Sequence, residues 1–454
     1  MELFRKKDLS RLLSERAVRE KTYGFFDLFL LGIGAIIGTG ILVLTGIIAS
    51  TQAGPAVILS FGISALAAIF IGLCYAEVAT SIPNSGSIYG YAWVVLGQFP
   101  AHLLGWTMIG VYILSAATVA NGWTGYFAAL FSDFGIEIPE KFLMSYSQGG
   151  IVNLPAILIV LLISFILTRG SKESKAINNV MVILKLAILV LFVAVGIFYI
   201  EPMNWAPFAP FGASGVFAGA ATAFFAYLGF DTLATTAEEV KDVQKTLPKT
   251  IIISVLASTT LYIIVCLILT GVTRYSNLNK PEAMTFAMDL IGHPTVAMII
   301  SAGSVVGILA VILAFSLGAS NITMSMSQGG FFPKVFSKMN KKSKSPNFAI
   351  LCIGLITAVF AGILDVKALA NLANIGSLIA FAILCYVLMK FRKMYPNSIG
   401  GFKVPLYPVV PILGIVTCTF LIINLDLMSW ISYALWLVIG SIIYFAYSKK
   451  TIAV

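Results

Sequence analysis

The chain has 454 residues, of which 59% are hydrophobic and 11% are charged, and its mean hydropathy is +0.97. Soluble domains carry about 25% charged residues, so this composition excludes a soluble globular protein and predicts an all-α polytopic membrane protein. The formal net charge of +10 could indicate a nucleic-acid partner, but the placement of the basic residues argues against one, as shown below.

Apolar stretches predict twelve membrane-spanning helices, most of them close to the roughly 20 residues that a bilayer requires. Charged and polar residues precede the first stretch, which is too long for the apolar part of a cleavable signal. The expected spans are residues 25–49, 55–79, 101–130, 151–167, 176–200, 214–237, 251–271, 295–326, 348–363, 369–389, 409–425 and 429–447.

The basic residues gather in the loops on one side of these spans, together with both chain ends. The opposite side holds only Lys141, Arg274, Lys280 and Lys367. Cytoplasmic loops carry an excess of Lys and Arg, so we expect both termini in the cytoplasm. Membrane topology thus accounts for the charge, and we expect a lipid bilayer but no nucleic acid as a partner. Protein partners are left open.

The first span contains a glycine-rich stretch, residues 32–42, at its centre. Gly38 and Gly40 flank Thr39, and each glycine costs a helix interior about 1 kcal/mol relative to alanine. One interpretation is a helix broken at mid-membrane, where unwound backbone groups hold a small polar solute. The other is a close helix–helix crossing of the small-xxx-small kind.

A second interruption is predicted in the sixth span, residues 214–237. Gly229 weakens this helix, and Asp231 could cap the half-helix that restarts after it. Interrupted segments at corresponding positions of two five-helix halves are typical of transporters with inverted repeats. We therefore expect a ten-helix transport core over residues 25–390. A cytoplasmic segment (1–24) precedes it, and two further helices (391–448) and a cytoplasmic tail (449–454) follow.

Lys185 is the basic residue that lies deepest within a predicted span, about 13 Å from the start of its helix at 1.5 Å per residue. A buried ammonium is costly, and no acid stands four residues before or after it. The side chain could snorkel toward the interface. Alternatively, it is an internal titrating group or a fixed cation in place of a metal ion.

The remaining polar residues predict no metal site, no cofactor and no enzyme. The five cysteines are isolated within apolar segments, which favours free thiols. No nucleophile–base pair, metal motif or P-loop is present in the sequence. Glu77, at the end of the second span, is either a solvated helix end or part of a gate.

Three ordered motifs resemble those of the amino acid–polyamine–organocation (APC) superfamily. They are Gly34-Ala35-Ile36-Ile37-Gly38-Thr39-Gly40-Ile41; Tyr75-Ala76-Glu77 with Pro83, Gly86-Ser87 and Tyr89; and Phe225-Ala226-Tyr227-Leu228-Gly229-Phe230-Asp231 with Glu238-Glu239 and Leu247-Pro248-Lys249. Together with Lys185, the set is most similar to bacterial members of the cationic amino acid transporter (CAT) branch.

This resemblance implies a LeuT-like fold with a 5+5 inverted repeat and broken helices 1 and 6. It implies that the N–H groups of Thr39 and Gly40 meet a substrate carboxylate, and that carbonyl groups of Ile36, Phe225 and Leu228 take the ammonium. Gly38, Ala226 and Gly229 complete the expected substrate site. Lys185 would occupy the place of a sodium ion in sodium-coupled relatives, and we expect it to couple transport to protons.

The sequence departs from the family pattern in the third and eighth helices. Val111 stands where an acid usually precedes Tyr112, and the basic residue near Asn321 and the Arg-Asp-Gly near Gln328 are missing. The loss of the acid favours neutral substrates. We expect secondary active import of Ala- or Ser-like neutral L-amino acids by proton symport and alternating access, in a bacterial plasma membrane. An amino acid exchanger, a cationic amino acid permease and a membrane sensor are the alternatives.

Overall fold

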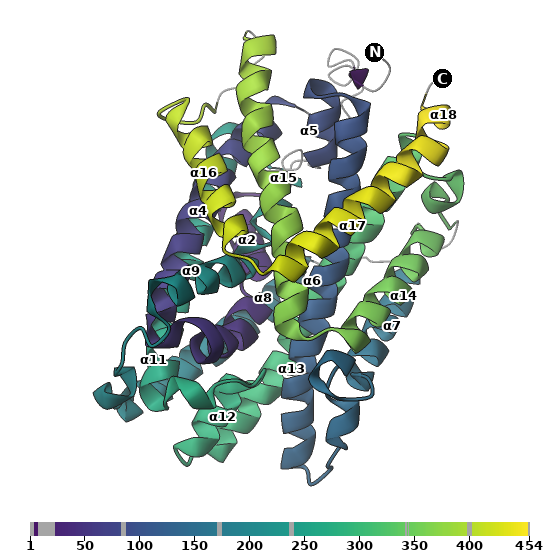
Figure 1. Ribbon diagram of the computed structural model, residues 1–454. Helices are drawn as coiled ribbons and strands as arrows, with labels where there is room; N and C mark the ends of the chain where they lie inside the picture. Colours follow the sequence, from purple (N-terminus) through teal and green to yellow (C-terminus); the bar gives the residue numbers. More distant parts are fainter. Residues whose placement is uncertain are drawn as a thin grey trace.

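The computed structural model is a bundle of long helices (Figure 1), and it describes residues 4–7, 23–82, 88–169, 175–235, 240–340, 343, 345–396 and 402–452. Eight helices in these ranges are long and apolar enough to cross a membrane, and four shorter apolar helices accompany them. The described part contains no strand, and Tyr23 and Val240 form an isolated bridge. The prediction of an all-α membrane protein is confirmed. Pro83, Gly86, Ser87, Glu238 and Glu239 of the family motifs lie outside the described residues.

Helices lie on all twelve predicted ranges. The first half of the chain contains α2 (Phe25–Ile36), η2 (Gly40–Leu44), α3 (Thr45–Ile48), η3 (Ala49–Ala53), α4 (Val57–Ser81), α5 (Ile88–Val95), α6 (Gln98–Asp133), α7 (Leu154–Thr168), α8 (Lys175–Gly196), α9 (Gly212–Ala223), η9 (Phe224–Tyr227) and α10 (Phe230–Thr235). The second half contains α11 (Val243–Val272), α12 (Ala283–Leu290), α13 (Pro294–Gln328), α14 (Asn347–Ile363), α15 (Val366–Met394), α16 (Val409–Ile423), α17 (Leu427–Ile443), η13 (Tyr444–Ser448) and α18 (Lys449–Thr451).

The core of the bundle forms around α6 and α13, the two longest helices, which pack against each other. Helix α15 lies against α6, and α4 packs between α11 and α9. The outward faces of α7, α14 and α17 carry apolar side chains such as Leu158, Leu355 and Leu435. Apolar surfaces of this extent mark contact with a membrane or a partner, and here they are suited to lipid.

Helix α17 runs diagonally along α6 and ends beside the C-terminal helix α18 (Figure 1). The indoles of Trp106 and Trp436 stack with ring centroids 4.4 Å apart, and each indole N–H donates to the backbone carbonyl of the other tryptophan. These contacts hold α17 against α6, the central helix of the core.

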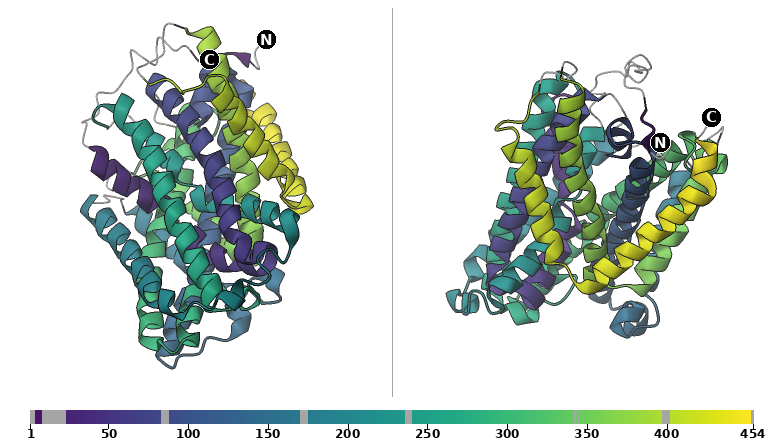
Figure 2. Two further views of the ribbon diagram at one scale, coloured as in Figure 1. Left: turned by 90° about the vertical axis from the view of Figure 1, so that its left-hand side faces the viewer. Right: turned by 45° about the horizontal axis from the view of Figure 1, so that its top comes forward.

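The described ends of the chain lie at the same end of the bundle (Figure 2). Near the N-terminus, the Lys7 N–H donates to the Trp93 carbonyl (3.3 Å) and the Gln98 N–H donates to the Arg5 carbonyl (3.1 Å). Near the C-terminus, the Thr451 hydroxyl donates to the Gly330 carbonyl (2.7 Å). An even number of crossings places the two ends of a chain in this way.

Glu77 is not a solvated helix end, so that interpretation is wrong. Its carboxylate is fully buried and accepts two bonds from the guanidinium of Arg392, each 2.6 Å long. The backbone N–H of Val404 donates to the same carboxylate (2.6 Å). This buried ion pair connects α4 to α15 and to the segment that leads into α16. The pair is strong because a carboxylate and a guanidinium fit each other in bidentate geometry. All five cysteines are free, as predicted.

Candidate substrate site at two helix breaks

The first break lies within the glycine-rich stretch. Helix α2 ends at Ile36, Ile37 is extended (φ −77°, ψ 106°), and the chain becomes helical again in the π-helical turn η2, which begins at Gly40. The first N–H groups of any helix have no partner within that helix. The restarted segment therefore presents the N–H groups of Thr39 and Gly40 at a positive helix end, which suits an anion.

The second break lies between η9 and α10. After the 3₁₀ turn of η9, Leu228 is extended (ψ 136°), Gly229 adopts φ +116°, and α10 begins at Phe230. Side chains disfavour this positive φ, whereas glycine tolerates it. A Cβ atom at position 229 would also lie 2.5 Å from the carbonyl oxygen of Ala35. Glycine is required at this position for both reasons.

The two breaks touch each other. A Cβ atom on Gly40 would overlap the Cα and Cβ atoms of Ala226, while Gly229 lies against Ala35 on the other side. The predicted site residues of both segments are thus brought together in the buried core. The glycine-rich stretch is at once an interruption and a close crossing, so the two interpretations of it do not exclude each other.

Lys185 reaches the first break from α8. Its side chain is 2% exposed, and the ammonium donates to the carbonyl oxygens of Gly34 (3.3 Å) and Ile37 (3.4 Å). The stem of the side chain packs against Gly307 of α13. The lysine therefore does not snorkel to the membrane interface; instead it places a cation beside the carbonyls at the end of α2.

Tyr262, on α11, contacts both breaks. Its hydroxyl lies 2.9 Å from the Ile36 carbonyl oxygen and 2.8 Å from the Ala226 carbonyl oxygen, and it donates toward both. The Phe225 carbonyl, which was expected to meet the ammonium, accepts the Leu228 N–H (3.1 Å) within η9. A carbonyl oxygen has two lone pairs, so this bond leaves it able to accept a second donor.

A hydrogen-bonded pair connects α6 to the second break. The hydroxyl of Tyr112 donates to one carboxylate oxygen of Asp231 (2.7 Å), and the Gly229 N–H donates to the other (3.2 Å). Asp231 is 3% exposed. Both oxygens of this buried acid are thus engaged by groups of the protein itself.

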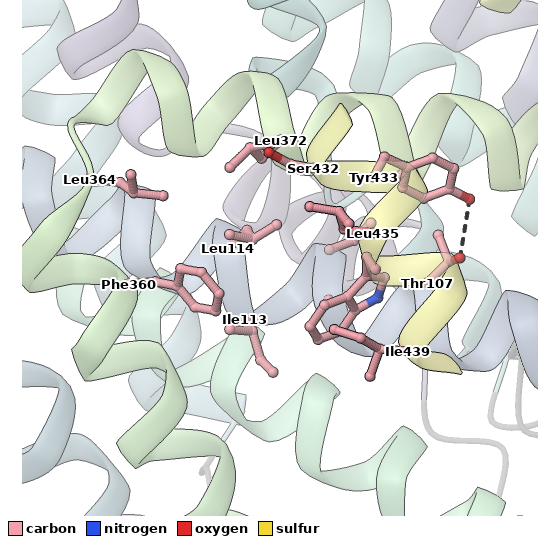
Figure 3. Close-up of a pocket in the computed structure, with 14 residues that line it drawn as sticks. Thr107, Ile113, Leu114, Phe360, Leu364, Leu372, Ser432, Tyr433, Leu435 and Ile439 are labelled. Atoms are coloured by element: carbon pink, nitrogen blue, oxygen red, sulfur yellow. Dashed lines mark hydrogen bonds between the residues drawn. The ribbon is translucent and has the colours of Figure 1, made fainter. Parts of the chain in front are cut away.

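Val111 faces α15 and an apolar cavity. A Cβ atom on Gly376 of α15 would lie 2.8 Å from a Val111 methyl carbon, and Val111 lines an apolar cavity of about 230 Å³ between α6, α14, α15 and α17 (Figure 3). The labelled side chains Leu114, Phe360 and Leu435 line the same cavity, and Tyr433 bonds to Thr107 at its edge. The neighbouring Tyr112 contacts α13 and Asp231 instead. The expectation of a neutral substrate therefore receives no support from position 111.

Sequence reasoning missed the roles that Tyr262 and the Tyr112–Asp231 pair have in this geometry. Tyr262 lies in the middle of an apolar span with no motif around it. Tyr112 and Asp231 stand 119 residues apart in the chain. A tyrosine hydroxyl at mid-membrane needs a partner when it is buried, which is the one signal that could have singled out Tyr262.

Long apolar helices and two interrupted segments that meet in the core are typical of a membrane transporter. The chain belongs to the amino acid permease family of the APC superfamily, since the model of that family matches residues 23–445. It is 42% identical to a methylthioribose transporter of Bacillus subtilis (strain 168) over 452 residues, which cover 99% of this chain and 98% of that protein.

Two further relatives are named for amino acids. A branched-chain amino acid permease, BcaP, of the same Bacillus strain is 41% identical over 461 residues and covers 99% of this chain and 98% of the relative. Human cationic amino acid transporter 4 is 33% identical over 384 residues, which cover 83% of this chain and 60% of the human protein. The resemblance to the CAT branch is thereby confirmed at the level of the family.

Proposed function

We propose that the protein is a secondary active transporter that imports neutral L-amino acids, Ala- or Ser-like in size, by proton symport through alternating access. The observation that carries this proposal is the contact between the two breaks, where helix-end N–H groups and backbone carbonyls converge. A zwitterion has the complementary groups, because its carboxylate suits the restarted helix end and its ammonium suits the carbonyls.

The surroundings of the breaks support a neutral side chain. Val311 of α13 lies against Gly38, since a Cβ atom there would be 3.2 Å from a Val311 methyl carbon. The rings of Phe225 and Phe315 are buried, and Phe315 packs on Tyr112 with ring centroids 5.8 Å apart. Each carboxylate oxygen of Asp231 already accepts one hydrogen bond, so a cationic side chain would have to share that acid with the Tyr112 hydroxyl and the Gly229 N–H. The relative named for branched-chain amino acids agrees with an apolar pocket.

Lys185 is the proposed proton-coupling residue. As a cation, it holds the Gly34 and Ile37 carbonyls and fixes the end of α2. Burial disfavours a charged ammonium, and a neutral amine binds carbonyls less strongly than an ammonium does. Loss of the proton would therefore weaken the hold on these carbonyls and allow α2 to move. The proton then has different affinities for the two arrangements of the helix, as any ligand that shifts a conformational equilibrium must have.

We further propose twelve spans in a 5+5 inverted repeat, a bacterial plasma membrane, and both termini in the cytoplasm. The shared location of the described chain ends and the one-sided distribution of basic residues support this topology. Reaction of single cysteines near residues 5 and 450 with an impermeant thiol reagent in spheroplasts tests the orientation. Labelling without lysis would overturn it.

A second candidate substrate is methylthioribose, because a relative of that name is 42% identical over nearly the whole chain. This neutral sugar has neither an ammonium nor a carboxylate. It would leave the carbonyls at the breaks without a cationic donor, which is why we place an amino acid first.

Uptake into proteoliposomes tests these proposals. A panel of labelled Ala, Ser, Leu, Arg and methylthioribose is offered with and without an inward proton gradient. We expect Ala and Ser to be concentrated in preference to Leu, and only when the gradient is imposed, with protein-free liposomes as the control. Preferred uptake of Arg identifies a cationic permease, preferred uptake of methylthioribose identifies a sugar carrier, and uptake that requires internal substrate identifies an exchanger. Each of these results would overturn the proposal.

A further inference from the structure

Tyr262 occupies the point at which both helix breaks need a hydrogen-bond donor. In an unbroken helix, the carbonyl of Ile36 would accept an N–H four residues later, and so would the carbonyl of Ala226. In the 3₁₀ turn of η9, the Ala226 carbonyl would accept the Gly229 N–H three residues later, but that N–H is directed to Asp231. The hydroxyl of Tyr262, 0% exposed, lies 2.9 Å from Ile36 O and 2.8 Å from Ala226 O and can take the place of either missing donor.

One hydroxyl cannot satisfy two carbonyls at once, because it has a single proton to donate. At any moment either Ile36 O or Ala226 O therefore lacks this donor. A buried carbonyl without a donor is unfavourable, so the pair forms a site that is short of one hydrogen-bond donor. An α-ammonium has three N–H donors and a positive charge, and it would supply the missing one.

We propose that the Tyr262 hydroxyl stands in for the substrate ammonium in the empty transporter. Without substrate, it alternates between the two carbonyls and keeps both breaks bridged. When an α-ammonium binds, the ammonium takes one carbonyl and the hydroxyl keeps the other. This inference rests on the proposed function. It assigns Tyr262 to the step of the transport cycle in which the empty protein returns to accept a new substrate.

The ring of Tyr262 is held independently of its hydroxyl. It packs edge-on against Phe61 and Tyr227, with ring centroids 5.2 Å and 5.5 Å away. The substitution Tyr262→Phe therefore removes the donor and preserves the packing. Tyr227→Phe is a matched control, because the Tyr227 hydroxyl donates to Phe61 O (3.0 Å) and pairs with the hydroxyl of Thr259 (3.1 Å) instead of bridging the breaks.

Two transport modes in proteoliposomes separate this role from a merely structural one. Net uptake into empty vesicles requires the empty protein to return, whereas exchange against internal substrate does not. We expect Tyr262→Phe to lower net uptake about tenfold relative to exchange, which corresponds to about 1.4 kcal/mol. Tyr227→Phe should leave the ratio of the two rates within twofold of wild type. An equal loss in both modes, or an unchanged ratio, would overturn the proposal.

A second measurement applies if Tyr262→Phe does not fold. Replacing Tyr262 by 3-fluorotyrosine keeps the ring and makes the hydroxyl a stronger donor, which competes harder with the ammonium. The substrate concentration for half-maximal uptake should rise at least twofold, and an unchanged value would contradict the role of the hydroxyl. Wild-type protein that moves no amino acid in either mode contradicts the proposed function itself. Wild-type transport with no effect of either substitution contradicts this inference alone.

Discussion

Substituting Gly40 by Ala tests the contact between the two helix breaks. The new Cβ atom would overlap Cα and Cβ of Ala226. One of these atoms belongs to the backbone, so no side-chain rotation relieves the clash. Overpacking of this kind costs about 1–3 kcal/mol, and Ala regains about 0.5–1 kcal/mol over Gly in a helix. Because the Cα atom of Ala226 belongs to the backbone and cannot rotate aside, we expect the upper part of the overpacking range to apply. The net destabilisation is then about 2 kcal/mol.

If the strain is relieved by separation of the two breaks, the proposed substrate site is distorted and the same free energy is lost from substrate binding. Two kcal/mol corresponds to about 30-fold in affinity. The assay is equilibrium binding of the best labelled substrate to detergent-solubilised protein, after monodisperse elution has shown that the variant is folded. We expect insertion into the membrane to be retained, because the change adds one methyl group to an apolar segment.

Gly62→Ala is the matched control for this experiment. Gly62 lies within α4, and no atom stands within 4 Å of the Cβ that alanine would add. This variant should bind substrate as the wild type does and be equally or slightly more heat-stable, since Ala favours a helix. If Gly40→Ala binds with wild-type affinity and melts at the wild-type temperature, the breaks do not touch as described.

Three further substitutions test other parts of the site and the fold. Lys185→Ala should retain exchange but lose uptake driven by a proton gradient; unchanged concentrative uptake would refute the coupling role. Glu77→Gln breaks a buried ion pair, which costs about 3–5 kcal/mol, so the melting temperature should fall clearly. Lys245→Ala removes an exposed ion pair and should leave the melting temperature unchanged. Tyr112→Phe removes a hydrogen-bond donor from the buried carboxylate of Asp231 and should slow uptake. Tyr433→Phe, at the apolar cavity, should not. Equal uptake by both variants would argue against a role of the Tyr112–Asp231 hydrogen bond in transport.

Much of the helical framework was predictable because hydropathy is a local property. Twenty apolar residues in succession need no knowledge of the rest of the chain to be assigned to a bilayer. The breaks were also predictable in place, since Gly38, Gly40 and Gly229 disfavour helix wherever they occur. What composition could not decide was whether these glycines unwind the chain or bring two helices together, and the contact of Gly40 with Ala226 shows that they do both.

Long-range polar contacts were not predictable by the same reasoning. The ion pair between Glu77 and Arg392 joins residues 315 positions apart, and without its partner Glu77 looked like a solvated helix end. The surroundings of position 111 were not predictable for a related reason. Its hydropathy is evident from the sequence, but a helix presents adjacent residues to different neighbours. Val111 faces α15, while Tyr112 reaches Asp231.

The balance of donors and acceptors supports the proposal that a cationic group of the substrate binds where the helices break. Interrupting a helix frees carbonyls at one end and N–H groups at the other, and at mid-membrane no bulk water can satisfy them. Lys185 supplies donors to Gly34 and Ile37, but Tyr262 brings only one proton to Ile36 and Ala226. In the proposed scheme, one carbonyl remains to be satisfied by the substrate, and an ammonium can do so without displacing Lys185. A sugar hydroxyl also donates one proton, but it carries no charge, so the same site would hold it less strongly.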